Sequence, residues 1–218
     1  MLLRRARLCP IVLVVSLAVA SVAAAATPEQ VSNFFRAVQL DDARTVKTML
    51  GGQVDPNEIN PVGGEPALVL AVREGAMDVF QAMLADPGTR VDAPAVNGNT
   101  ALMMAAFKGN RPAAEALVAK GAAVNRPGWT PLHYAAAAGD EGIAALLLEH
   151  GARVDAVSPR ASGSYTPLMM AAREGKEDMA VFLRKRGASP TLKNGEGLTA
   201  AQIAERADHK SLARTLAP

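Results

Sequence analysis

Cysteine and histidine, the side chains that most often build metal sites and nucleophilic centres, are scarce in this chain. Cys9 is the single cysteine among 218 residues, and the three histidines are His133, His150 and His209. None of the histidines lies within metal-ligand spacing of another, and no serine stands beside an evident base. Glycine loops with the lysine needed to cradle phosphate are also missing. We therefore expect no catalytic residue, no metal, no cofactor and no enzymatic activity.

The chain also lacks a useful surplus of charge. It has 23 basic and 21 acidic residues, and three of the basic ones, Arg4, Arg5 and Arg7, stand together at the start. Without that start, 20 basic residues face 21 acidic ones. The sequence isoelectric point of about 8.8 therefore originates in the first residues. It gives no reason to expect a nucleic-acid partner.

Residues 1–26 have the composition of a secretory signal peptide. A basic start is followed by an apolar stretch and then by small residues ending in Ala26, which predicts cleavage before Thr27. We expect a bacterial protein that is periplasmic or secreted, and the cysteine-free remainder suits an oxidising compartment. The alternative is an uncleaved N-terminal membrane anchor, although the apolar run hardly reaches spanning length.

After residue 26, one sequence motif recurs along the chain. It reads Thr-Pro-Leu-His-Tyr-Ala-Ala from Thr130, with related copies from Pro66, Thr100 and Thr166 and degenerate ones from Ser32 and Thr199. The threonine suits a helix N-cap, the following proline suits the first helical position, and a glycine nine residues after the threonine suits the helix end. A second apolar segment follows each copy. This pattern predicts pairs of helices that must stack on their neighbours to bury their apolar faces.

The Thr-Pro-Leu-His motif and its spacing of about 33 residues resemble the ankyrin repeat. The resemblance implies an all-α solenoid of about six helix-turn-helix units, in which His133 ties one repeat to its neighbour. We expect an N-terminal capping repeat at 28–60, repeats at 61–97, 98–127, 128–163 and 164–195, and a C-terminal capping repeat at 196–218. The connection before Thr130 is short and the one before Thr166 is long.

In ankyrin stacks, the first helices and the turns before them line a concave face. Three of the chain's few aromatic residues, Phe107, Trp129 and Tyr165, occupy the slots that the resemblance implies are exposed there, whereas the others fall at core slots. Aromatic and arginine side chains are the usual anchors of protein interfaces. The predicted partner-binding residues are Arg73, Glu74, Phe107, Lys108, Trp129, Tyr165, Arg173 and Glu174.

Each aromatic residue also has a structural interpretation. Phe107 would cover the neighbouring helix, Trp129 would fill the gap left by the short connection, and Tyr165 would pin the long one.

The functional hypothesis is an exported, non-catalytic module that binds a partner protein, acts as a monomer, and contacts neither nucleic acid nor, after cleavage, membrane. Resemblance to exported bacterial ankyrin proteins suggests support of an envelope or oxidative-stress enzyme such as a catalase. Two alternatives remain open, a membrane-tethered scaffold and a secreted effector or immunity-type inhibitor.

Overall fold

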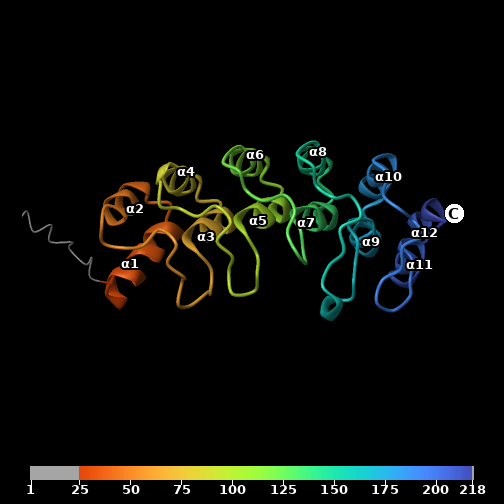
Figure 1. The fold of residues 1–218 in the computed structure, drawn as a ribbon, viewed down its shortest axis with the longest axis horizontal. Helices are drawn as coiled ribbons and strands as arrows, with labels where there is room; N and C mark the ends of the chain where they lie inside the picture. The colour runs from red at the N-terminus through yellow and green to blue at the C-terminus, as the bar shows by residue number, and fades with distance from the viewer. Residues whose placement is uncertain (1–24, 218) are drawn as a thin grey trace, which may run out of the picture.

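The computed structural model describes residues 25–217, so residues 1–24 of the predicted signal peptide lie outside the described part. The described chain forms an elongated stack of helix pairs that follow one another in sequence order (Figure 1). This confirms the predicted all-α solenoid of about six helix-turn-helix units. The pairs are α1 (Pro28–Gln39) with α2 (Ala43–Leu50), α3 (Ala67–Glu74) with α4 (Met77–Ala85), α5 (Ala101–Lys108) with α6 (Arg111–Ala119), α7 (Pro131–Ala138) with α8 (Glu141–Glu149), α9 (Pro167–Arg173) with α10 (Glu177–Lys185), and α11 (Ala200–Arg206) with α12 (Lys210–Leu216).

The two helices of a pair belong to two different rows. The odd-numbered helices α3, α5, α7 and α9 run along the middle of the molecule, and the even-numbered helices α4 to α10 lie above them in Figure 1. The long connections between repeats loop out on the opposite side of the odd-numbered row. None of the helices within residues 25–217 is long and apolar enough to cross a membrane.

Helix starts and ends follow the local sequence rules. The hydroxyl groups of Thr100 and Thr166 accept hydrogen bonds from the backbone N–H groups three residues later, at 3.4 and 3.3 Å. Pro131 and Pro167 occupy the first helical position, where a missing N–H costs nothing. Gly139 ends α7 in the left-handed conformation with φ of 83°. These residues therefore fix where each first helix begins and ends.

The first repeat departs from the predicted register at its start. Ser32, which the spacing places at a helix start, lies inside α1, because the helix begins at Pro28 behind a cap formed by Thr27 and Gln30. The end of α1 keeps the register. Asp41 adopts a positive φ of 56°, the conformation that glycine adopts at the equivalent place in the middle repeats. The first helix of this terminal repeat, α1, is thus about one turn longer at its start than the first helices of the middle repeats.

A continuous core runs through the whole stack. Buried apolar side chains extend from Val31 in α1 to Leu216 in α12 and belong to one cluster. The odd-numbered helices contribute pairs of fully buried alanines, Ala105–Ala106, Ala135–Ala136 and Ala171–Ala172. Such small side chains let neighbouring helices approach closely, so burial is shared between repeats rather than completed within any one of them.

Polar side chains in the connections join each repeat to the next. Asn57 donates to the carbonyl of Gly88 and accepts from the N–H of Arg90, and Asn125 makes the same pair of bonds two repeats along, to Gly151 and Arg153. Two aspartates act similarly, since Asp92 accepts from the N–H of Ala123 and Asp155 from that of Ser189. These bonds fix the spacing between repeats in the segments that follow the even-numbered helices α2 to α10.

The connection before α7 is shortened. It spans residues 120–130, whereas 86–100 precede α5 and 150–166, which include the short 3-10 helix Arg160–Ser162, precede α9. Neighbouring connections elsewhere share backbone hydrogen bonds, from Val96 to Gly64 at 2.7 Å and from Gly195 to Gly163 at 2.8 Å. Among the described residues, no backbone bond of this kind joins 123–129 to a neighbouring connection. The row of loops is therefore interrupted between α5 and α9.

Candidate binding groove

The first helices of three consecutive repeats enclose a groove of about 400 Å³. Phe107 comes from the end of α5, Trp129 from the short connection before α7, and Ala137 from α7 itself. Arg173, at the end of α9, and Glu174, immediately after it, close the far side. The structure thus brings together four of the eight predicted binding residues. The remaining lining residues are His133, Tyr134 and Met170.

Aromatic rings form one wall of this groove in mutual edge-to-face contact. The Tyr134 ring lies 6.3 Å from the Phe107 ring and 6.3 Å from the Trp129 ring, with interplanar angles of 90° and 62°. Its hydroxyl donates a 2.6 Å hydrogen bond to the Oδ1 atom of Asn99. Burial raises the pKa of Tyr134, so the phenol keeps its proton and remains the donor. Tyr134 therefore holds the other two rings in place, while Phe107 remains 54% exposed.

His133 lies beneath the groove and is completely buried. Its Nδ1 atom accepts from the Thr130 N–H at 3.2 Å, and its Nε2 atom therefore carries the proton that is donated to the Tyr165 carbonyl at 3.0 Å. Burial lowers the pKa of His133 to about 4, so the ring is neutral near pH 7. The Trp129 ring packs edge-on against it at 5.2 Å. The expectation that His133 joins its repeat to the next is confirmed.

Tyr165 corrects one prediction. The position of Tyr165 within the ankyrin repeat predicts an exposed side chain, yet only 8% of the residue is exposed. Its N–H donates to the Ser158 hydroxyl and its carbonyl accepts from the Ser158 N–H, each at 2.8 Å, which holds the long connection against α9. The Arg173 guanidinium covers the ring at 5.4 Å from its centroid. Tyr165 thus pins the long connection, and it supports the groove without lining it.

Three further predicted residues lie away from the groove. Arg73 forms ion pairs with Glu65 and with Glu74, on α3 and the turn before it, two repeats before α7. Burial raises the pKa of Glu65 against the opposing effect of Arg73. Lys108 follows Phe107 but lines a neighbouring depression, which shares Phe107 with the groove and also includes Asp140 and Glu141. The predicted set is therefore divided among three places on the stack.

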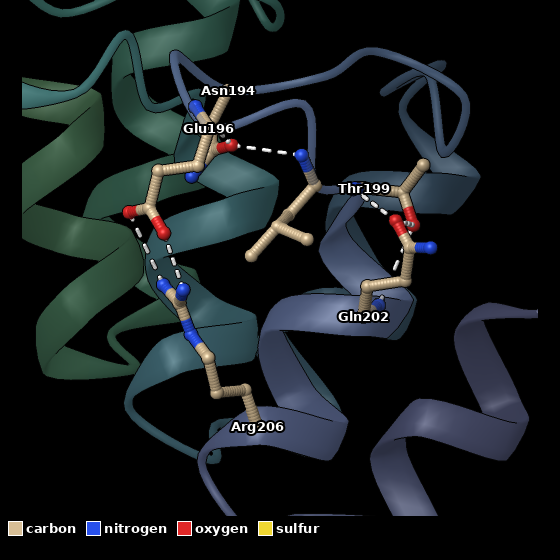
Figure 2. Close-up of polar contacts among 6 residues, drawn as sticks. Asn194, Glu196, Thr199, Gln202 and Arg206 are labelled. Carbon is tan, nitrogen blue, oxygen red and sulfur yellow. Dashed lines mark hydrogen bonds and ion pairs between the residues drawn. The ribbon is translucent and has the colours of Figure 1, made fainter.

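The last repeat shows how the arginines at the ends of the first helices are neutralised. Arg206, which occupies in α11 the slot of Arg173 in α9, pairs with Glu196 from the preceding turn (Figure 2). The same close-up shows Asn194 accepting from the Leu198 N–H, which shapes that turn. Arg173 pairs instead with the residue that follows it, Glu174, and its Nε atom lies 2.9 Å from that carboxylate. These arginines thus already have partners within the chain.

Sequence reasoning missed part of the lining. Tyr134 falls at a predicted core position, yet it is half-buried and lines the groove, and Met170 is a further lining residue that the sequence pattern did not indicate. The signal for the groove itself was the pair Ala137–Ala138, because alanine replaces the larger residues found at this slot in neighbouring repeats and leaves the space open. Within residues 25–217, no group of three His, Cys, Asp or Glu side chains is placed to hold a metal ion.

Comparison with known proteins agrees with this architecture. The family profile described as "Ankyrin repeats (3 copies)" matches residues 34–127, 68–158 and 124–194. The chain therefore belongs to the ankyrin-repeat family, whose domains are typically non-catalytic modules for protein–protein interaction. A stretch of 94 residues, 42% of the chain, is 38% identical to the RelA-associated inhibitor of Mus musculus. The chain covers only 11% of that protein's length.

Proposed function

We propose that this protein is an exported, non-catalytic module that holds a partner protein in the groove between α5, α7 and α9. The observation that supports the proposal is the rigid aromatic wall of Phe107, Trp129 and Tyr134 beside an alanine floor. Exposed aromatic side chains around a concave site are typical anchors of a protein interface. The name of the mouse relative describes an inhibitor associated with another protein, which agrees with a binding use of the shared repeats.

Export is the second part of the proposal. It rests on the signal-like composition of residues 1–26 and on the absence of cysteine from the sequence after Cys9. Sequencing the N-terminus of the native protein tests it. Thr27 as the first residue is the expected result, whereas a retained Met1 would indicate a membrane-tethered scaffold instead.

The binding claim is tested by co-purification from the envelope fraction, with an oxidative-stress enzyme as the first partner class to be assayed. We choose Phe107→Ala, which removes an exposed anchor, and Ala137→Arg, which fills the groove without removing any packing atom. Leu40→Ala removes an apolar side chain that is also exposed, 69% against 54% for Phe107, near the other end of the stack. Ala119→Arg adds the same bulk at an exposed position at the end of α6, in the other helix row.

We expect the two groove variants to bind the partner at least about tenfold more weakly, since loss of an anchor costs more than 1–2 kcal/mol. The two control variants should bind like the original protein. Circular dichroism melting confirms that each variant is folded. If folded Ala137→Arg captured its partner at the original level, the groove would not be the binding surface.

A further inference from the structure

The peptide bond at which the predicted signal peptide ends is part of the folded structure. Ala26, which precedes this bond, is half-buried and packs against the core cluster. Together with Ala25 it lines a depression whose other wall is formed by residues 52–55 in the connection after α2. Signal-peptide cleavage depends on small side chains directly before the bond. The fold therefore occupies one of the side chains that a signal peptidase has to bind.

The other side of the same bond is held by the start of α1. The Thr27 N–H donates to the Gln30 Oε1 atom at 2.8 Å, and the Gln30 N–H donates to the Thr27 hydroxyl at 3.2 Å. The Thr27 carbonyl accepts from the Val31 N–H at 3.0 Å, and the helix begins at Pro28. The nitrogen atom of the Ala26–Thr27 bond thus belongs to the capping box of α1.

This arrangement protects the bond through its conformation. A protease cuts most readily where the chain is exposed and its backbone is free of hydrogen bonds, so that the chain can enter the enzyme. Thr27 is exposed, but its N–H and carbonyl are bound within α1, and that helix is anchored by the buried side chains of Val31, Phe34 and Val38. Cleavage of the folded chain therefore has to proceed through the small fraction of molecules in which the start of α1 is open.

We propose that the Ala26–Thr27 bond is cleaved before the first repeat folds, so that folding and processing compete for the same residues. Hydrolysis breaks the bond between the Ala26 carbonyl carbon and the Thr27 nitrogen. Water supplies the hydroxyl group of the new carboxyl group on Ala26 and the proton of the new amino group on Thr27. Chains that fold first keep residues 1–26, which makes release and tethering two outcomes for one chain. This inference rests on the proposed export and adds the order of events to it.

The test incubates the folded, purified full-length chain with a bacterial signal peptidase in detergent and follows the mass of the product over time. One variant carries about six Gly and Ser residues inserted after Ala26, a flexible linker that separates the bond from α1. In a second variant, Phe34→Asp, a charge at a fully buried position prevents α1 from packing. We expect both variants to be cleaved after Ala26 at least about tenfold faster than the original chain.

A milder pair of variants tests the cap itself. Gln30→Ala removes the acceptor of the Thr27 N–H. Gln202→Ala removes the equivalent acceptor from the capping box of Thr199, in α11 near the other end of the stack (Figure 1). Because the loss of a cap raises the open population of its own helix, Gln30→Ala should be cleaved about threefold to tenfold faster than the original chain. Gln202→Ala should be cleaved at the original rate, and circular dichroism checks that both variants are folded.

The outcomes separate this inference from the proposed export. If the folded original chain is cleaved as fast as the linker variant, or if Gln202→Ala accelerates cleavage as much as Gln30→Ala, folding does not protect the bond and the inference is wrong, while export stands. If neither the linker variant nor Phe34→Asp is cleaved after Ala26, the bond is not a signal-peptidase site. Export by cleavage then fails, and this inference fails with it.

Discussion

Burial of neutral His133 makes the stability of the stack depend on pH. The pKa of this histidine is about 4 in the folded protein, against an ordinary value of 6.5, because the ring is removed from water. The folded pKa lies below the unfolded one, so the unfolded chain binds the extra proton first as the pH falls. The contribution of the neutral ring is therefore complete above pH 6.5 and is lost progressively between 6.5 and about 4.

The size of the effect follows from these two pKa values. Lowering the pH from about 7.5 to about 5 should reduce the free energy of unfolding by about 2 kcal/mol through His133 alone, since one pKa unit corresponds to about 1.4 kcal/mol. Glu65 acts in the opposite direction, because burial raises its pKa and the folded state then gains stability as that carboxyl is protonated. A variant is therefore needed to isolate the histidine.

His133→Gln is a suitable reference. Gln30 and Gln202 occupy the same third helical position in α1 and α11, where their side chains accept from the N–H of the capping threonine as His133 does. Urea unfolding of both proteins, followed by circular dichroism at the two pH values, gives the difference directly. We expect the original protein to lose about 2 kcal/mol more than His133→Gln. Equal losses would show that burial does not hold the imidazole neutral, and the reasoning would be refuted.

Three other changes test the packing and the turns. Leu132→Ala should reduce the free energy of unfolding by about 2–5 kcal/mol, because the side chain is fully buried between repeats; urea unfolding measures it. Asp41→Ala should cost about 1 kcal/mol, since the carboxylate accepts from the Val79 N–H at 2.9 Å and caps α4; Asp41→Asn, which keeps an acceptor, should cost less in thermal melts. Gly139→Ala should cost about 1–2 kcal/mol because φ is 83°, whereas Gly142→Ala, in helical backbone, should not destabilise the fold in the same assay.

Much of the fold was predictable because its rules are local and repeated. Thr100 and Thr166 cap their helices, Pro131 and Pro167 begin theirs, and Gly139 ends its helix, each through a preference that needs no knowledge of the neighbouring repeat. The start of α1 escaped this reasoning for a physical reason. With no repeat before it, the helix is free to extend back to the cap formed by Thr27, and Ser32 becomes an ordinary helical residue.

The groove was less predictable because it depends on contacts between repeats. The position within the repeat indicated that Phe107, Trp129, Arg173 and Glu174 face the same side, and the structure places all four along one groove; their binding of a partner stays a prediction. The same reasoning placed Tyr165 wrongly, because that side chain turns under Arg173. Whether Arg173 covers Tyr165 or the reverse depends on the length of the connection before α9. The pattern within a single repeat contains no information about that length.

Connection length also links the irregularity of the sequence to the site. A regular spacing would place a full loop before α7, like the one in which Val96 bonds to Gly64. The shortened connection 120–130 instead ends in Trp129, whose ring packs against His133 and Tyr134. The longer connection before α9 is held down by Tyr165, which keeps it against α9. Two opposite departures from the repeat thus shape one groove, because Trp129 at the short connection forms part of its wall and Tyr165 at the long one lies under Arg173.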